Sequence, residues 1–341
     1  MNFNIYPIPP FYDPLKVKEI WRVLYEKRAL DALEWANEYE IKPAYQDKFK
    51  INLIIIDVQN TFCIPGGELF VGGRSGLGAV EDTQRLCSFI YSNLGNISQI
   101  TLTLDTHQTI QIFHEIFLIN DKGLHPQANT LITSEDISSG KWKFNQEIGA
   151  SIGLNAKQGQ EYLEFYVNEL KKKGKYDLTI WPYHALLGGI GHALVSSLEE
   201  AVFFHSIARK CQTDFELKGF NPLTENYSVI KPEVDHDSKG ILLGNVNQKI
   251  IDNLSLFDMT IIAGQAKSHC LRSTVEDILS AIIEKDKSLV NRIYLLEDTT
   301  SSVVIPGFLD YTDEADAQFE KFKEAGMHLV RSEEPLKNWI H

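Results

Sequence analysis

An almost uninterrupted apolar run in residues 50–57 restricts the folds open to this chain more than any other stretch. Five of the six residues from Ile51 to Ile56 are isoleucine or leucine. A strand with apolar side chains on both faces must be covered on both faces, which is typical of a parallel sheet between two layers of helices. The sequence therefore predicts an α/β fold built around a buried parallel sheet.

Strand-like and helix-like patterns alternate along the rest of the chain. Apolar periodicity predicts further strands over residues 97–104, 177–181, 213–218, 259–264, 290–296 and 327–330. It predicts helices over residues 14–40, 80–94, 161–173, 190–208, 241–257, 273–284 and 312–325. This order favours right-handed parallel crossovers in a doubly wound three-layer sandwich with a mostly parallel central sheet. Polar residues gather at the C-terminal ends of the strands, where ligands bind in such sheets.

The main domain is expected to span residues 50–332. Residues 1–49 form an N-terminal arm and helix, an extension that packs either on the main domain or on a partner subunit. Residues 108–176 interrupt the strand–helix order, and we interpret them as an insertion or lid because a connection of this length rarely lacks structure or purpose. Residues 333–341 remain as a C-terminal tail.

Composition excludes several classes of function. The net charge of the 341-residue chain is −13, and no basic cluster exceeds Lys171–Lys173 with Lys175, so no nucleic-acid surface is expected. No apolar run approaches the roughly 20 residues of a membrane span, and no signal peptide is apparent. The four cysteines form no C-x-x-C pair, which is typical of reduced thiols in the cytoplasm. The glycines of residues 66–78 match neither a dinucleotide-binding nor a Walker motif.

Cys270 occupies the point where an apolar strand passes into a helix. Free amide groups and the positive end of the helix dipole gather at such a point, and they favour a thiolate and can hold an oxyanion. Taken alone, Cys270 also fits a buried structural cysteine. Asp57 and Lys218 likewise end strands, although the first is compatible with a helix cap and the second with a surface position. Asp105, His107 and His184 have the chemistry of metal ligands, and the short Asp105–His107 segment is also compatible with a solvated loop.

Six segments in sequence order resemble the motifs of the nicotinamidase branch of the isochorismatase-like cysteine hydrolases. The resemblance runs over residues 50–332. The segments are Asp57–Phe62, Asp105–His107, Trp181–His184, Lys218–Gly219 with Glu225–Ser228, Gly264–Cys270 and Glu297–Thr299. Their joint order is far more specific than any one of them, and it favours the functional interpretation of each residue named above.

The resemblance implies a thiol amidase. Asp57 would be the general base and then the acid, Lys218 would stabilise the thiolate, and Cys270 would attack the amide carbonyl to form a thioester. The amide groups of Ala266 and Cys270 would form the oxyanion hole. In the family the peptide before this alanine is cis, which here is the bond between Gln265 and Ala266.

The resemblance also implies a bound divalent metal ion, with Asp105, His107 and His184 as ligands. Zn²⁺ is expected, and Mn²⁺ and Fe²⁺ also suit these donors. In nicotinamidases the pyridine nitrogen of the substrate takes one metal position. His114 and His125 are alternatives to His184, and Glu225 occupies a position that could touch a metal-bound water. Three aromatic residues would wall the flat ring of the substrate: Phe62, Trp181 and Tyr227.

The expected activity is hydrolysis of nicotinamide to nicotinate and ammonia. An alternative is another, larger amide, because the connection between His107 and His184 is longer than usual and the family's P-x-x-H after D-x-H is replaced by Gln108–Gln111. A binding or assembly protein on a retired hydrolase fold is a further alternative. An ether hydrolase of the isochorismate type is disfavoured because that activity typically dispenses with the cysteine. The expected partner is a small-molecule amide, with no nucleic acid and no membrane, and the resemblance allows a homo-oligomer.

Overall fold

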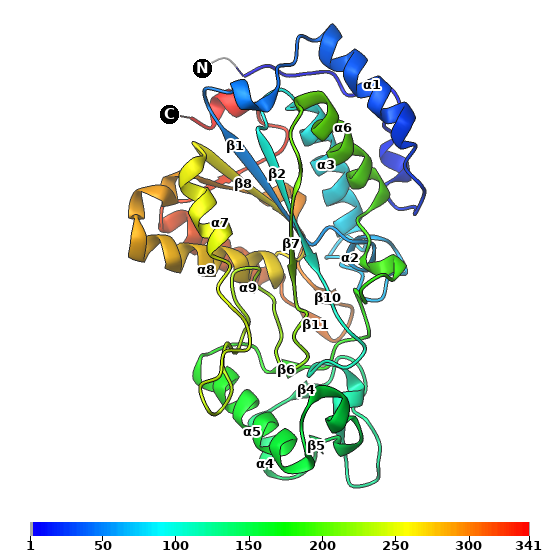
Figure 1. Ribbon diagram of the computed structural model, residues 1–341, viewed down its shortest axis with the longest axis vertical. Coiled ribbons are helices and arrows are strands. Elements are labelled where there is room, and N and C mark those ends of the chain that lie inside the picture. Colours follow the sequence, from blue (N-terminus) through cyan, green and yellow to red (C-terminus); the bar gives the residue numbers. More distant parts are fainter. Residues whose placement is uncertain (1–2, 341) are drawn as a thin grey trace.

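A six-stranded sheet, in which each strand runs parallel to its neighbours, forms the centre of the computed structural model, which describes residues 3–340 (Figure 1). The strand order is β12–β9–β8–β1–β2–β7. The strands are β1 (Ile51–Ile56), β2 (Gln99–Asp105), β7 (Asp214–Lys218), β8 (Met259–Gly264), β9 (Ile293–Leu296) and β12 (His328–Val330). The predicted α/β sandwich with a parallel central sheet is confirmed. Met1, Asn2 and His341, at the ends of the predicted arm and tail, lie outside the described residues.

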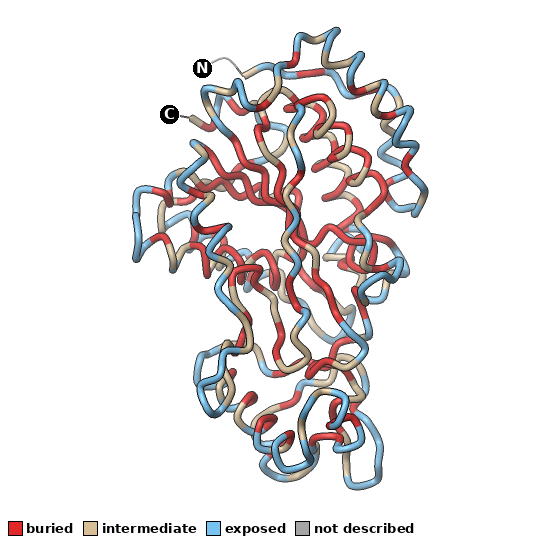
Figure 2. Tube along the Cα trace, in the orientation of Figure 1, coloured by how far each residue is buried: buried red, intermediate tan, exposed pale blue. Residues whose placement is uncertain are grey.

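The side chains of β1 alternate between two apolar cores, which explains its uninterrupted apolar sequence. Ile51, Leu53 and Ile55 pack in one core with α3 (Gly78–Ser92) and α6 (Ser196–Arg209). Ile54 and Ile56 pack in the other core with α7 (Gln248–Asn253), α8 (Cys270–Lys285) and α9 (Thr312–Glu324). The sheet is therefore a buried layer between two layers of helices (Figure 2).

The N-terminal extension packs on the main domain, alongside α6 (Figure 1). The predicted single helix over residues 14–40 is wrong: a 3₁₀ turn at Pro14–Lys16 is followed by α1 (Tyr25–Glu38). The segment between them is non-helical because the backbone N–H and C=O of Trp21 both bond the Ser196 hydroxyl, at 2.9 and 2.7 Å. Arg209 of α6 also donates to the carbonyl of Lys42 and to the Asp47 carboxylate, so the extension is fixed to the domain at Trp21 and near its C-terminal end.

A third apolar core lies beyond the C-terminal edge of the sheet, in the lower part of Figure 1. It is built from the connection between β2 and α6, whose elements are β3 (Leu118–Ile119), β4 (Leu131–Ile132), α4 (Ser134–Ser138), β5 (Lys143–Phe144), α5 (Ala156–Lys172) and β6 (Leu178–Thr179). The strand predicted over 177–181 is short and pairs antiparallel with β4, outside the central sheet. The reason is that Ile180 and Trp181 donate their N–H groups to Thr130 and Phe113 of the same connection.

The helix predicted over residues 241–257 begins late, at Gln248. The Asp237 carboxylate accepts the backbone N–H groups of Lys239 and Ile241, and this turn prevents a helix there. The remaining elements are α2 (Asn60–Cys63) and the ribbon of β10 (Val304–Ile305) and β11 (Leu309–Asp310). None of the helices within residues 3–340 combines the length and apolar character required to cross a membrane.

Candidate active site

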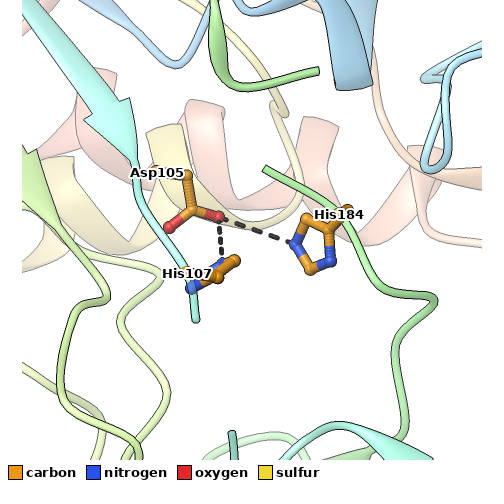
Figure 3. Close-up of side chains that lie close together, drawn as sticks. All are labelled: Asp105, His107 and His184. Carbon is orange, nitrogen blue, oxygen red and sulfur yellow. Dashed lines mark hydrogen bonds and ion pairs between the residues drawn. The ribbon is translucent and has the colours of Figure 1, made fainter. Parts of the chain in front are cut away.

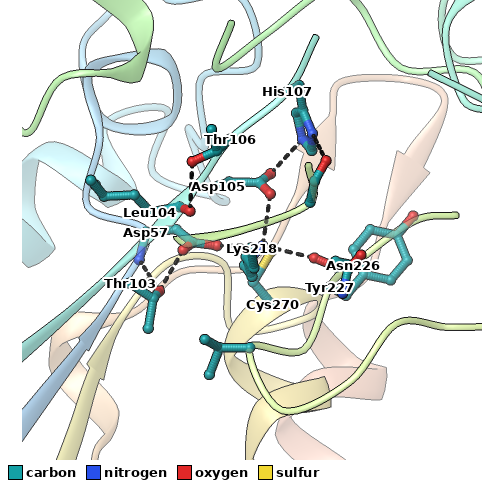
Figure 4. A network of polar contacts seen from close by, with 12 residues as sticks. Asp57, Thr103, Leu104, Asp105, Thr106, His107, Lys218, Asn226, Tyr227 and Cys270 are labelled. Carbon is teal, nitrogen blue, oxygen red and sulfur yellow. Dashed lines mark hydrogen bonds and ion pairs between the residues drawn. The ribbon is translucent and has the colours of Figure 1, made fainter. Parts of the chain in front are cut away.

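Three of the predicted reactive groups meet at the C-terminal edge of the sheet. Asp57 follows β1, Lys218 ends β7, and Cys270 begins the helix that follows β8. The Lys218 Nζ lies 2.9 Å from Asp57 Oδ2 and 3.5 Å from Cys270 Sγ (Figure 4). All three side chains are buried. An acid, an ammonium and a thiol from distant parts of the chain are thus within bonding reach of one another.

Lys218 also joins this group to Asp105. Parallel pairing of β2 and β7 places the two residues directly opposite, and the Lys218 Nζ lies 2.9 Å from Asp105 Oδ1. Its remaining contact is the carbonyl of Asn226, at 2.8 Å. A buried carboxylate is costly unless it is paired, so this one ammonium makes the burial of both Asp57 and Asp105 tolerable.

Asp57 is held in place by the neighbouring strand. The Thr103 hydroxyl of β2 donates to Asp57 Oδ1 at 2.5 Å, and the Asp57 N–H bonds the Thr103 carbonyl at 3.3 Å. The backbone of Asp57 has a positive φ of 48°. Burial raises the pKa of Asp57, while the charge of Lys218 and the Thr103 hydrogen bond act in the opposite direction. The result is an oriented carboxyl group that is more basic than an exposed one.

The protonation of Cys270 differs from the expectation for a cysteine at a helix N-terminus. Burial raises the pKa of the thiol well above its usual value, and Lys218 opposes this only in part because Asp57 and Asp105 add negative charge. This direction is opposite to the lowering expected from the helix position alone. A buried thiol beside a carboxylate instead needs that carboxylate to take its proton when it reacts.

Two backbone N–H groups beside Cys270 are free to bind a developing oxyanion. The amides of Ala266 and Cys270 have no hydrogen-bond partner within residues 3–340. Both residues line the same cavity. The peptide between Gln265 and Ala266 is cis, as the resemblance predicts. Such paired donors are the usual feature that stabilises the tetrahedral intermediate of acyl transfer.

Asp105, His107 and His184 point toward one another (Figure 3). The Nε2 atoms of the two imidazoles lie 2.9 and 3.7 Å from the same carboxylate oxygen, Asp105 Oδ2. Each Nδ1 lies close to a backbone carbonyl, that of Gly219 at 3.1 Å and that of Pro182 at 2.7 Å. These carbonyls accept a hydrogen from Nδ1 and leave the Nε2 lone pairs facing the carboxylate. A cation shared by the three groups stabilises this arrangement, so the residues fit a divalent metal ion.

The alternative histidines occupy different places. His125 lies in the connection, with Nδ1 2.6 Å from the Leu118 carbonyl. His114 lies closer to the cluster, with its ring centre 6.2 Å from that of His184. Its buried Nε2 has no hydrogen-bond partner among the described residues. It adjoins the three-residue cluster and does not replace His184. Burial raises the pKa of Glu225, which lines the adjoining cavity, to about 8.

A narrow cavity lies between the reactive group at Cys270 and the cluster of Asp105, His107 and His184. It has room of about 30 Å³ for the centre of a water-sized molecule. The predicted aromatic walls all line it, together with the predicted nucleophile and two of the predicted ligands: Phe62, Trp181, Tyr227, Cys270, Asp105 and His184. Trp181 Nε1 donates to the Tyr227 hydroxyl at 3.0 Å, which fixes two of the walls.

Sequence reasoning missed residues that position the reactive groups. Thr103 orients Asp57, and Gln59 receives the Asp105 N–H at 2.8 Å through its side-chain oxygen. Gly219 holds His107 through its carbonyl, and its φ of +84° would strain any other residue. A signal for Thr103 existed, because residues 101, 103 and 105 alternate along β2 and therefore share one face of the sheet.

Neither a protein-family model nor a curated protein sequence matches the chain. Several solved structures do match the chain. Yeast nicotinamidase Pnc1p aligns with a TM-score of 0.50 and 18% identity over 82% of this chain and 99% of its own. The complex of Pnc1p with the inhibitor nicotinaldehyde aligns with a TM-score of 0.49 and 17% identity, over 82% of this chain and 99% of its own. The nicotinamidase and pyrazinamidase of Acinetobacter baumanii aligns with a TM-score of 0.49 and 16% identity, over 84% of this chain and 98% of its own. At this identity the likeness to the yeast enzyme shows a shared fold, that of the isochorismatase-like hydrolases.

Proposed function

We propose that this protein is a cysteine amidohydrolase of the isochorismatase-like family, and that it hydrolyses nicotinamide to nicotinate and ammonia. The observation that carries the proposal is the convergence of Asp57, Lys218 and Cys270 beside the cluster of Asp105, His107 and His184. The fold shared with yeast nicotinamidase supports it.

The proposed reaction gives each of these side chains one role. Asp57 accepts the thiol proton as Cys270 Sγ bonds to the amide carbon, and Lys218 stabilises the negative charge that the sulfur carries. The N–H groups of Ala266 and Cys270 donate to the carbonyl oxygen while it carries negative charge. Asp57 then returns the proton to the nitrogen as the C–N bond breaks, so ammonia leaves and a thioester remains.

Water completes the cycle. Asp57 takes a proton from the water that attacks the thioester carbon, and the broken C–S bond regenerates the thiol as Asp57 gives the proton back. Asp105, His107 and His184 would hold a divalent ion, which would supply a Lewis acid that orients a ring nitrogen of the substrate. Phe62, Trp181 and Tyr227 pack against the flat ring and exclude water from it.

Ammonia release from nicotinamide by the purified protein tests the proposal. We expect turnover by the native protein and none by Cys270→Ala. Cys211→Ala is the matched control because Cys211 is only half-buried and contacts Gln99, at the end of β2 opposite to Asp105. No ammonia release with Zn²⁺, Mn²⁺ or Fe²⁺ supplied would reject nicotinamide as the substrate, and equal loss in both variants would reject the role of Cys270.

A larger amide is the second candidate. The connection between β2 and α6 has its own apolar core and supplies both Trp181 and His184 to the cavity, so it can shape the pocket for another substrate. A panel of pyridine, pyrazine and aliphatic amides separates the two candidates. Faster turnover of a bulkier amide than of nicotinamide would favour the second.

A further inference from the structure

The residue before Ala266 is a buried glutamine at the end of an apolar strand. The strand β8 contains only apolar residues, one threonine and one glycine, all of them buried, and Gln265 follows it directly. Gln265 is 1% exposed and lines the narrow cavity beside Cys270. A buried polar side chain costs roughly 1–3 kcal/mol for each donor or acceptor that is left unpaired. Gln265 therefore needs hydrogen-bond partners from outside its own strand.

Both ends of the Gln265 side chain have such a partner. Its Nε2 donates to Asp82 Oδ2 of α3 at 2.9 Å, and its Oε1 accepts the backbone N–H of Ser301 at 3.3 Å. A carboxylate accepts hydrogen bonds and a backbone N–H donates one, so only one orientation of the amide satisfies both partners. The Gln265 side chain is thereby held between α3 and the segment that follows β9.

Asp82 is itself held by Arg85, one turn further along α3. Asp82 is 2% exposed, and its Oδ1 lies 2.9 Å from the Arg85 guanidinium. Arg85 Nε also donates to the carbonyl of Asp298. Burial raises the pKa of Asp82, while its hydrogen bonds to Gln265 and Arg85 act in the opposite direction. Asp82 is therefore a fixed point to which the Gln265 side chain is attached.

The peptide that Gln265 shares with Ala266 lies inside this set of contacts. The Gln265 N–H donates to the Ile56 carbonyl at 2.7 Å, and the Lys267 N–H donates to the Ser301 carbonyl at 2.9 Å. The Ala266 N–H lies between these two donors in the chain and has no partner among residues 3–340. Because a peptide unit is planar, the direction of this N–H depends on where the α-carbon of Gln265 is held.

We infer that Asp82 and Gln265 are positioning residues of the oxyanion hole: Asp82 holds the Gln265 side chain, and Gln265 sets the direction of the Ala266 N–H. The inference rests on the proposed function, because a carbonyl oxygen gains negative charge here only during acyl transfer to Cys270. An apolar residue at position 265 would fill the same space without a bond to α3. Its effect would fall on the charged carbonyl oxygen and not on the reactivity of the thiol.

Two reactions of Cys270 test the inference, because only one of them needs an oxyanion hole. 4-Nitrophenyl acetate acetylates the thiol: the S–C bond forms, the ester C–O bond breaks, and 4-nitrophenol leaves with the thiol proton. Negative charge passes through the carbonyl oxygen in this reaction. Iodoacetamide alkylates the same sulfur as the C–I bond breaks, iodide leaves and the thiol proton passes to water, so its carbonyl oxygen gains no charge. The rates in Cys270→Ala are subtracted from both.

Gln265→Met keeps the approximate size of the side chain and removes both of its hydrogen bonds. We expect acetylation to slow by at least about tenfold and alkylation to stay within about twofold of the native rate. Asp82→Asn keeps an acceptor for Gln265 and therefore loses less acetylation than Asp82→Leu. Thr83→Val is the matched control, because Thr83 is buried on the same helix but its hydroxyl bonds the Ala79 carbonyl at 2.7 Å, and it leaves both rates unchanged.

The double variant Gln265→Met with Asp82→Leu covers a single variant that fails to fold, because replacing both partners of a buried hydrogen bond costs less stability than leaving one unpaired. We expect the same selective loss of acetylation. An equal loss of both reactions, native acetylation in Gln265→Met, or a native protein acetylated no faster than Cys270→Ala would overturn the inference. The ester has no pyridine ring, so a selective loss in a protein that releases no ammonia from nicotinamide would contradict the proposed function alone.

Discussion

The substitution Thr103→Val tests whether Asp57 is the base that Cys270 requires. The valine keeps the size of the side chain and removes only the hydroxyl that donates to Asp57 Oδ1 at 2.5 Å. Thr103 is fully buried, so water cannot readily replace the lost donor. A hydrogen bond to a charged group contributes about 1.5–3 kcal/mol, which corresponds to roughly 1–2 pKa units at 1.36 kcal/mol per unit.

The sign of the effect follows from which form the hydroxyl stabilises. The Thr103 hydrogen bond lowers the pKa of Asp57, against the rise caused by burial, because it stabilises the carboxylate. Its removal raises the pKa further, so a higher pH is needed to form the base. We therefore expect the acid limb of kcat/KM to move to higher pH by about 1–2 units. Above the new limb the activity recovers toward that of the native protein.

The assay is ammonia release across a pH series, with Thr101→Val as the matched control. Thr101 is a buried threonine on the same face of β2, but its hydroxyl bonds Asn52 at 3.1 Å, away from Asp57. Its removal lowers stability by about 1 kcal/mol and leaves the pH profile unchanged. An acid limb that stays in place in Thr103→Val, or that moves equally in both variants, would refute Asp57 as the base.

Three further predictions concern the charges and the metal ligands. In Gly219→Ala the new Cβ would lie 2.7 Å from His107 Cε1, and the residue would keep a φ of +84°. Because the clash displaces His107, we expect Zn²⁺ to bind at least about tenfold more weakly in equilibrium dialysis, and an unchanged affinity would contradict this. Lys218→Met leaves the buried Asp57 carboxylate unpaired and removes the ammonium partner of Asp105, so it lowers the free energy of unfolding by about 3–5 kcal/mol in urea titrations. Adding Asp57→Asn restores part of the loss, and a loss below about 1 kcal/mol would show that the pairing matters little. His184→Ala lowers the metal content per chain after dialysis against Zn²⁺, whereas His125→Ala does not, and the reverse result would make His125 the ligand in place of His184.

Local sequence determined the elements and the chemistry available at their ends. The apolar run at Ile51–Ile56 requires cover on both faces, and the structure supplies it because alternate side chains enter two cores. Asp57, Asp105, Lys218 and Cys270 end strands or begin a helix in the primary sequence, and strands that are parallel bring those ends to one edge. The sequence alone therefore predicted which residues are candidates for the site, but not how they are arranged.

Only tertiary structure decided which of these residues meet and in what electrostatic state. The pairing of β2 with β7 sets Asp105 opposite Lys218 and so gives one ammonium two carboxylates, a contact between residues more than a hundred positions apart. Burial raises the pKa of the Cys270 thiol in spite of its helix position, and burial is a property of the packed molecule. The segments at 177–181 and 241–247 departed from their local patterns for the same reason: long-range and turn hydrogen bonds competed with periodicity and won.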